Sequence, residues 1–315
     1  MLILAPMQGL TELLFRRAFN RSFPGAFDLA VSPFLSITHG NLRDVGKKVD
    51  DVLPEANSGS IPVIPQLLGH ETGGFIDLAN RLYDLGYKEV NWNMGCPMRR
   101  VAGKHRGSGI LPYPNEVLQF LNAVVPKLKP ELSVKLRLGY RSKEEIDSII
   151  PILNDFPIKN VTIHPRIGKQ MYSGLPDMEK FSQTLPLVKH PVIYNGDICS
   201  VYDYKKIRSN FPQVKDVMIG RGALYNPLLP AQIREACPTD FTTNNYSAST
   251  ANAFINSLMD DILLMDVSTE AKCRKMKEYW CLFLKGLPGS EMSKREVLHA
   301  TRLEEIRNLI LDMTK

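Results

Sequence analysis

The sequence predicts an α/β fold: a closed (β/α)8 barrel, the TIM-barrel architecture, followed by a small all-helical domain. The 315 residues exceed the roughly 200 to 250 that a single β/α barrel uses. Short β-rich runs alternate with segments of helical periodicity from residue 2 to residue 219, and only helical patterns follow residue 238. Closure would leave no exposed sheet edge, and an open doubly wound sheet is the competing arrangement.

Eight runs rich in β-branched and apolar residues are the expected strands. They are residues 2–5, 27–31, 63–67, 89–93, 133–138, 160–164, 192–195 and 216–219. Helices are expected between them over residues 11–20, 74–85, 115–125, 142–154, 177–185 and 200–209. The connection 36–61 is long and contains NSGSIP, which indicates a loop with a short helix or a hairpin.

The polar, turn-rich segment TDFTTNNYSAST separates two expected domains. Residues 1–238 would form the catalytic barrel and residues 239–315 a helical domain. The helices expected in the second domain cover residues 251–265, 269–284 and 290–313.

The composition excludes several classes of protein. Hydrophobic residues make up 44% of the chain, enough for a buried core, and no apolar run reaches the roughly 18 to 20 residues of a membrane span. The five cysteines are scattered and form no Cys-x-x-Cys pair, which argues against a disulfide framework and against a zinc site. We therefore expect a cytoplasmic protein with no membrane association and no metal.

The charge balance permits a polyanionic partner. The formal net charge is +6, from 39 basic and 33 acidic residues. Two basic clusters suit the phosphates of a polyanion; a solvated loop is the alternative for the first, and we expect Trp280 and Phe283, near the second, in the core. The first contains Arg99, Arg100, Lys104, His105 and Arg106, and the second contains Lys272, Arg274, Lys275, Lys277 and Lys285, with Tyr279 and Trp280 among them.

Polar residues and glycines follow most of the expected strands, at the end of a barrel where reactive groups gather. Asn195, Gly196 and Asp197 follow the seventh strand, and Gly220, Arg221 and Gly222 follow the eighth. Main-chain N–H groups in glycine-rich turns, together with a guanidinium, are typical of a phosphate site. Ordinary turns between strand and helix are the alternative.

Lys135 and Arg137 alternate with apolar residues, so they share one side of a strand that a barrel buries on both faces. Cations there need an anionic partner. A lysine at such a strand end would stabilise the anionic reduced form of a flavin ring, and an ion pair with an interior carboxylate is the alternative. His164 also ends a strand, so we expect it on the same rim.

Cys96 lies in NMGCP, on the loop that follows the fourth strand. A thiol on a rim loop can act as an acid if its pKa keeps it protonated near neutral pH. A buried, inert cysteine is the alternative, and it is what we expect for Cys199, Cys237, Cys273 and Cys281.

Six segments together resemble the tRNA-dihydrouridine synthases. They are APMQG, NMGCPMRRVAGKHRGSGIL, SVKLRLG, IHPR, NGDI and MIGRG, in this order and spacing. The resemblance covers about residues 1–235, with a looser match through RKMKEYWCLFLKGLPG. Its specific part is Asn-x-Gly-Cys-Pro followed by the basic glycine loop.

The resemblance implies an FMN-dependent enzyme that reduces the C5=C6 bond of a uridine in tRNA, in the D-loop, with NADPH or NADH as reductant. It implies hydride transfer from flavin N5 to C6 and a proton from Cys96 to C5. The implied cofactor contacts are Pro6, Met7, Gln8, Gln66, Lys135 and His164 at the ring, and Asn195, Gly196, Asp197, Gly220 and Arg221 at the ribityl and phosphate groups. The implied RNA contacts of the expected monomer are Asn93, Arg99, Arg100, Lys104, Arg137, Lys275 and Lys277.

Two departures from the family pattern affect the substrate side. Pro33 stands where the family commonly has an acidic residue, and HPRIGKQMYSG replaces the usual H-G-R-T, so Ile167 lacks a hydroxyl and Pro165 stiffens the turn. Three alternatives stay open: another FMN barrel oxidoreductase, such as a dihydroorotate dehydrogenase-like enzyme, the same chemistry on ribosomal RNA, and a noncatalytic RNA-binding protein.

Overall fold

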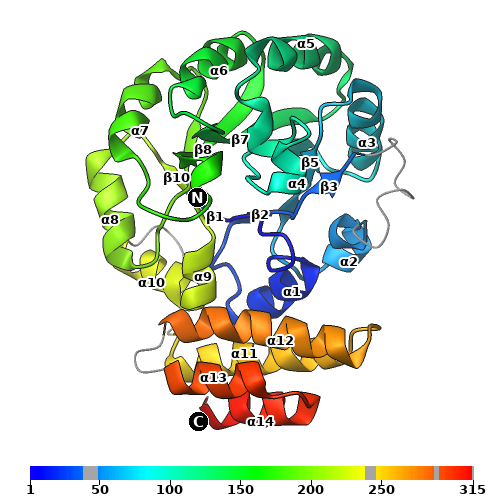
Figure 1. Ribbon diagram of the computed structural model, residues 1–315, viewed down its shortest axis with the longest axis vertical. Coiled ribbons are helices and arrows are strands. Elements are labelled where there is room, and N and C mark those ends of the chain that lie inside the picture. The colour runs from blue at the N-terminus through cyan, green and yellow to red at the C-terminus, as the bar shows by residue number, and fades with distance from the viewer. Residues whose placement is uncertain (38–48, 238–245, 287–290, 314–315) are drawn as a thin grey trace.

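The computed structural model describes residues 1–37, 49–237, 246–286 and 291–313. A ring of strands is surrounded by helices, and a layer of further helices lies against one side of the ring (Figure 1). The expected domain boundary after residue 238, the start of the expected helix at Ser290 and part of the connection 36–61 fall outside the described residues.

The ten described strands all pair in parallel, in the order β3-β5-β6-β7-β8-β9-β10-β1-β2-β4. They are β1 (Leu2–Leu4), β2 (Leu29–Val31), β3 (Leu35–Ser36), β4 (Val63–Ile64), β5 (Gln66–Leu68), β6 (Glu89–Met94), β7 (Glu131–Gly139), β8 (Ile158–Ile167), β9 (Val192–Tyr194) and β10 (Asp216–Ile219).

The ring of strands closes at the third strand position of the barrel, which β4 and β5 fill together. β2 pairs with β4 and β3 pairs with β5, while only Pro65 separates β4 from β5. β5 continues the ring through β6, and β1 pairs with both β10 and β2. β2 with β3, and β4 with β5, therefore each fill one position of an eight-position barrel, which confirms the predicted (β/α)8 architecture.

Each of the six helices expected in the barrel is present, and side chains cap several of them. Glu71 accepts hydrogen bonds from the N–H groups of Gly73 and Gly74, and Ser200 accepts one from Asp203 N, so these helices begin where the sequence supplies an acceptor. The six expected helices are α1 (Leu13–Ser22), α3 (Thr72–Asp84), α5 (Pro114–Val124), α6 (Glu145–Asn154), α7 (Met178–Thr184) and α8 (Val201–Asn210). The described part of the barrel also contains α2 (Pro54–Asn57), α4 (Arg99–Ala102), α9 (Arg221–Tyr225) and α10 (Leu229–Ala236).

The C-terminal part contains α11 (Ala248–Leu263), α12 (Thr269–Phe283), α13 (Glu291–His299) and α14 (Leu303–Met313). The prediction of one helix over 290–313 is wrong, because the chain breaks after His299. Thr301 N donates to Glu305 Oε2 (3.3 Å), so an acidic side chain stabilises the start of a second helix. The break lets Val297 and Ile306, both fully buried, pack in the same core.

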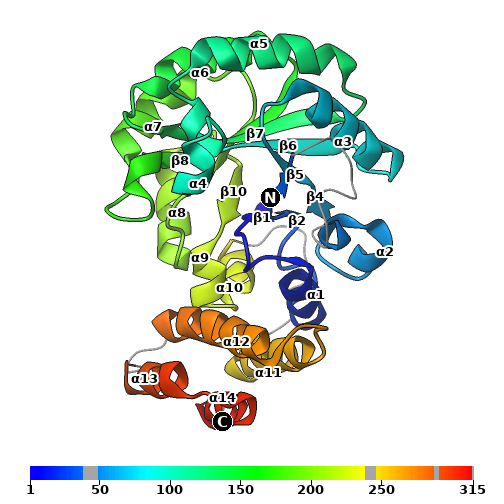
Figure 2. The same cartoon turned by 45° about the vertical axis from the view of Figure 1, so that its right-hand side comes forward.

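An aromatic cluster joins the barrel to these helices. The ring of Phe254 in α11 lies 5.6 Å from that of Phe15 and 5.5 Å from that of Phe19, both in α1, in edge-on geometry. Tyr279 in α12 stacks on Phe15 at 6.0 Å. The barrel and the helical layer therefore share one hydrophobic core, and α11 and α12 lie beneath α1 (Figure 2).

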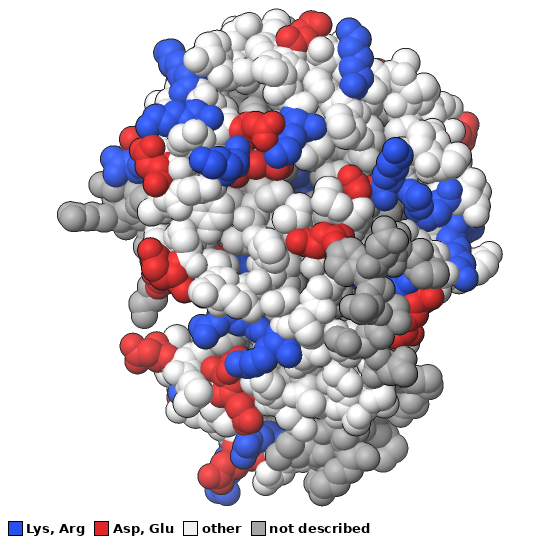
Figure 3. Space-filling view, turned by 180° about the vertical axis from the view of Figure 1, so that it is seen from behind, with Lys and Arg blue, Asp and Glu red and all other residues white. Residues whose placement is uncertain are grey.

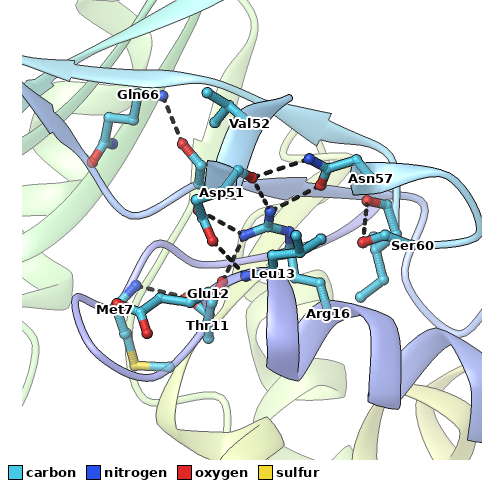
Figure 4. Close-up of polar contacts among 12 residues, drawn as sticks. Met7, Thr11, Glu12, Leu13, Arg16, Asp51, Val52, Asn57, Ser60 and Gln66 are labelled. Atoms are coloured by element: carbon cyan, nitrogen blue, oxygen red, sulfur yellow. Dashed lines mark hydrogen bonds and ion pairs between the residues drawn. The ribbon is translucent and has the colours of Figure 1, made fainter. Parts of the chain in front are cut away.

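The chain after β1 is held by a buried arginine. The side chain of Arg16 is fully buried, and its guanidinium donates to Thr11 O (2.9 Å), Asp51 Oδ2 (3.1 Å) and Asn57 Oδ1 (2.9 Å) (Figure 4). Burial raises the pKa of Asp51, and the charge of Arg16 opposes that rise. Asp51 also accepts a hydrogen bond from Leu13 N, so one cluster joins the β1 loop, α1 and residues 51–57.

Replacing Arg16 with Met should lower the free energy of unfolding by about 3–5 kcal/mol, because it leaves Asp51 without its buried partner. The measurement is chemical denaturation. The matched control is Arg17→Met on the same helix, where the side chain is exposed and the expected change is within about 0.5 kcal/mol. Equal stability of the two variants would contradict this role of the cluster.

Candidate active site

The interior of the barrel is apolar on one side and polar on the other. A small apolar cluster comes from β1, β2, β9 and β10 and from the residue that follows β1. It consists of Ile3, Ala5, Val31, Ile193 and Met218. On β5, β6 and β7, buried polar side chains take the corresponding inward positions. A buried polar group is stable only with hydrogen-bond partners, so this half is where a site can be built.

Strand register connects the polar side chains. Gln66 is paired with Asn91, and Asn91 with Ser133. Gln66 Nε2 donates to Asn91 Oδ1 (2.8 Å), and Asn91 Nδ2 donates to Ser133 Oγ (2.9 Å). Asn93 Nδ2 donates to Gln66 Oε1 (2.6 Å). Since residues in register on parallel strands point the same way, these side chains form one inward-facing network.

The network fixes the turn that carries Cys96. The Oδ1 atom of Asn93 accepts from Gly95 N (3.0 Å) and Cys96 N (2.9 Å). The carbonyl of Cys96 accepts from Ser108 N (3.0 Å) and Ser108 Oγ (3.1 Å). A Cβ on Gly107, whose φ is +57°, would lie 2.6 Å from Cys96 O, so only glycine lets the loop close on the thiol.

The Cys96 thiol is kept protonated. Burial raises the pKa of this thiol above its ordinary value, and a main-chain hydrogen bond from Met98 and the charges of Arg137, Arg100 and Lys135 only partly oppose the rise. A protonated thiol held by fixed main-chain contacts at the rim can donate a proton to a bound molecule.

Cations gather beside this thiol. Burial and the neighbouring charge of Arg137 lower the pKa of Lys135 to about 7. Among the described residues, no acceptor bonds the Lys135 ammonium. Burial and four neighbouring cations, from Arg137, Lys135, Arg166 and Arg221, hold the pKa of His164 well below its ordinary value, so its imidazole is neutral.

Two arginines complete the group and are already bonded. Arg137 is 2% exposed and donates to the carbonyls of Gly95 (3.1 Å), Ile167 (2.9 Å) and Met171 (2.6 Å). Arg166 is 1% exposed and forms an ion pair with Asp197. Asp197 also pairs with Arg221. This positive group is therefore only partly neutralised by Asp197, which leaves it suited to an anionic ligand.

Hydrogen bonds and positive charge outweigh burial at Asp197. Burial by itself would raise the pKa of Asp197, but Arg166 and Arg221 lower it below its ordinary range. In the described part of the chain, the main-chain N–H groups of Gly196, Asp197, Arg221 and Gly222 have no acceptor. Two adjacent turns thus offer free donors beside a guanidinium, as the phosphate prediction requires.

The β1 loop adjoins these turns. The Thr11 hydroxyl donates to Ala5 O (2.9 Å) and accepts from Met7 N (2.8 Å), which fixes the loop that contains Pro6, Met7 and Gln8. A Cβ on Gly220 would be 3.4 Å from Met7 Sδ. Gln8 Oε1 is buried and has no partner within the described residues. The structure thus brings together both groups of predicted cofactor residues.

The predicted RNA contacts fall into two groups. Arg99, Arg100 and Lys104 are exposed on and after α4, which follows the Cys96 turn. Lys275 already donates hydrogen bonds to Gly9 O and to the Glu12 carboxylate. Lys277 donates one to Leu298 O. On the face opposite that of Figure 1, acidic and basic side chains are interspersed (Figure 3). A phosphate contact by any of these residues stays a prediction.

Sequence reasoning missed Arg166 and Tyr172. Arg166 lies two residues after His164 on β8, so the alternation that identified Lys135 and Arg137 would have identified it too. Tyr172 lies in the loop after β8, and its ring is 5.4 Å from the guanidinium of Arg137 and 4.8 Å from that of Arg221. No periodic signal marks a loop residue of this kind.

Comparison with protein families matches residues 3–314 to the family described as dihydrouridine synthase. A tRNA-dihydrouridine(16) synthase of Neisseria meningitidis serogroup B is 26% identical over 100% of this chain and 95% of its own length. A probable tRNA-dihydrouridine synthase of Rickettsia bellii is 32% identical over 74% of this chain and 70% of its own.

Solved structures share the fold at low sequence identity. The old yellow enzyme homologue of Zymomonas mobilis has a TM-score of 0.54 at 14% identity, over 78% of this chain and 93% of that one. A 2-naphthoyl-CoA reductase complex has a TM-score of 0.55 at 11% identity, over 82% of this chain and 53% of that one. Among the described helices, none has the length and apolar character needed to cross a bilayer, and no metal-binding cluster of His, Cys, Asp and Glu side chains occurs in the same residues.

The raised pKa of Cys96 predicts a distinct pH dependence of its alkylation. Since the thiolate reacts and the pKa lies above the ordinary 9.0, alkylation by iodoacetamide should be slow at pH 7 and accelerate only above pH 9. Arg100→Met should move this rise to higher pH, because it removes a charge that lowers the pKa. The rate is measured by peptide mass spectrometry.

The matched control for this experiment is Arg99→Met in the same helix. Arg99 is not among the charges that act on the thiol, so its removal should leave the alkylation profile unchanged. A wild-type rise centred below pH 9 would contradict the buried, protonated thiol.

Proposed function

The chain belongs to the dihydrouridine synthase family, and we propose that it reduces the C5=C6 bond of a uridine in tRNA to dihydrouridine with FMN as cofactor. The observation that carries the proposal is the family match over residues 3–314, which includes the Cys96 turn and the turns after β9 and β10. The full-length match to the Neisseria relative further supports uridine 16, in the D-loop, as the target.

The residues present fit an FMN molecule. Within the described ranges of the chain, the Lys135 ammonium and Gln8 Oε1 have no partner, which suits the polar edge of a flavin ring. The N–H groups of Gly196 and Arg221 have no acceptor in the same ranges, which suits its phosphate. We propose ring contacts by Pro6, Met7, Gln8, Gln66, Lys135 and His164, and ribityl and phosphate contacts by Asn195, Gly196, Gly220 and Arg221, with Asp197 orienting Arg221. When bound, FMN would supply the hydride for uracil C6, after reduction by NADPH or NADH.

Cys96 is the proposed proton donor. Its raised pKa keeps a proton on Sγ at neutral pH, where it can pass to C5 of the uracil. The thiolate left behind is stabilised by the charges of Arg137, Arg100 and Lys135, all of which lower the pKa of this thiol. Solvent then returns the proton. The same environment thus favours the thiol before transfer and tolerates the thiolate after it.

The RNA would approach over the exposed basic segment beside Cys96. Arg99, Arg100 and Lys104 are proposed to contact phosphates, while the target base leaves its stack to reach the thiol. Asn93 and Arg137 are hydrogen bonded at the rim, and we assign them to shaping the place where the base binds. The proposal includes a monomer in the cytoplasm, where its tRNA substrate would be.

An anaerobic absorbance experiment tests the proposal against its alternatives. The purified protein should show a flavin band that bleaches with NADPH and returns with tRNA lacking dihydrouridine. Return with orotate but not tRNA would favour a dihydroorotate dehydrogenase-like enzyme, and return only with ribosomal RNA would change the substrate. Absence of a flavin would favour the noncatalytic RNA-binding protein. Mapping dihydrouridine in the product tRNA tests position 16.

Cys96→Ala should lower the turnover of tRNA by about 10²–10⁴-fold, because it removes the proton donor. The flavin band should persist, since no contact to the phosphate turns is lost. Turnover is measured as dihydrouridine formed under single-turnover conditions. The control is Cys237→Ala at the end of α10, which should keep wild-type turnover; equal activity of the Cys96 variant would remove the thiol from the mechanism.

Replacing both Arg99 and Lys104 with Ser should weaken tRNA binding and reduce the slope of log affinity against log salt by about 2, roughly one per lost phosphate contact. Binding is measured at several salt concentrations. The control replaces Lys205 and Lys206, both exposed on α8, with Ser and should leave the slope unchanged. An equal loss in both double variants would indicate only nonspecific attraction.

A further inference from the structure

We propose that helix α12 is a positioning element of the cofactor site, acting through the main chain of the β1 loop and through α9. This inference rests on the proposed binding of FMN. Lys275 Nζ donates to Gly9 O and lies 2.8 Å from Glu12 Oε2. One turn further along the helix, the Tyr279 hydroxyl donates to Leu10 O. Two side chains of α12 thus hold two successive carbonyls of the loop.

The β1 loop transmits this hold to the proposed flavin contacts. Leu10 N and Thr11 N both donate to Met7 O (3.0 Å each), and Met7 N donates to Thr11 Oγ1 (2.8 Å). Residues 7–11 therefore form one closed turn. A shift of the Gly9 and Leu10 carbonyls would displace Met7 and Gln8, which we assign to the flavin ring.

The other end of α12 contacts the second cofactor segment. A Cβ on Gly286 would lie 1.9 Å from Tyr225 O, so the chain after α12 packs directly on the end of α9. Lys285 Nζ lies 5.6 Å from the centre of the Tyr225 ring. α9 begins at Arg221, in the proposed phosphate site. Because β1 and β10 are adjacent, the segments that follow them are neighbours, and α12 passes beneath both α9 and α1 (Figure 1).

The hydrogen bonds of Tyr279 and Lys275 to the β1 loop are not needed for packing between the barrel and the helical layer. Tyr279 is fully buried and stacks between Phe15 (6.0 Å) and Phe283 (6.1 Å), so a phenylalanine would pack there equally well. Burial also raises the pKa of the Tyr279 hydroxyl well above its ordinary value, which keeps it a neutral donor. The aromatic contacts join the domains, whereas the hydroxyl and the Lys275 ammonium act on the loop conformation.

The test measures the dissociation constant of FMN by fluorescence titration, and the absorbance maxima of the bound flavin, for Tyr279→Phe and Lys275→Met. Each variant loses a hydrogen bond to the loop, so FMN should bind about 3- to 10-fold more weakly, with shifted maxima. Glu12→Gln alters the same contact from the barrel side and should act in the same direction. If Lys275→Met does not fold, the FMN affinity of Glu12→Gln tests this contact instead.

Two matched controls separate positioning from general weakening of the helical layer. Lys277→Met removes a hydrogen bond to Leu298 O (2.9 Å) that lies within the helical layer. Tyr246→Phe removes one from the Tyr246 hydroxyl to Pro24 O (3.2 Å), at the other end of α1. Both should keep the wild-type FMN affinity and spectrum.

The outcomes are distinguishable. FMN binding by the wild type with unchanged affinity and spectrum in Tyr279→Phe and Lys275→Met would overturn this inference and leave the proposed function standing. An equal loss in the test variants and in both controls would also overturn it, since the contacts would then matter only for docking. Absence of FMN binding by the wild type would overturn the proposed function, and this inference with it.

Discussion

The closed parallel ring of strands is the constraint on which the site depends. Parallel register places Gln66, Asn91 and Ser133 side by side, so that each amide finds a partner inside the barrel. Asn93 donates to this network through its amide nitrogen, and its amide oxygen accepts hydrogen bonds that hold the Cys96 turn. A shift of one residue in any of these strands would turn the polar side chains outward and leave the turn unsupported.

The segment after β1 connects the remaining parts of the molecule. Thr11 closes the loop against Ala5 O, and Arg16 joins that loop to residues 51–57. From the other side, Lys275 and Tyr279 of α12 bind the same loop. A short stretch thus contacts the barrel end, a long connection and the helical layer at once, so the proposed cofactor site is shaped by all three.

The sequence predicted most of the architecture because strand and helix periodicities are local properties. All eight expected strand positions are present in the structure, and the three rim segments at Cys96, Asp197 and Arg221 follow the carboxyl ends of β6, β9 and β10. The failure arose where packing overrides periodicity. The helix predicted over 290–313 breaks after His299, where Glu305 caps a second helix and Val297 and Ile306 pack in one core.

The sequence by itself determined which chemical groups the protein carries at its strand ends: a thiol, cations and glycine-rich turns in a fixed order. Only the tertiary structure decided which of these groups are free. Among the residues that the structure describes, Lys135 has no hydrogen-bond partner while Arg137, Arg166 and Lys275 are bonded, and burial determines that the Cys96 thiol keeps its proton. Hydrogen bonding and desolvation depend on neighbours distant in the chain, which no local pattern specifies.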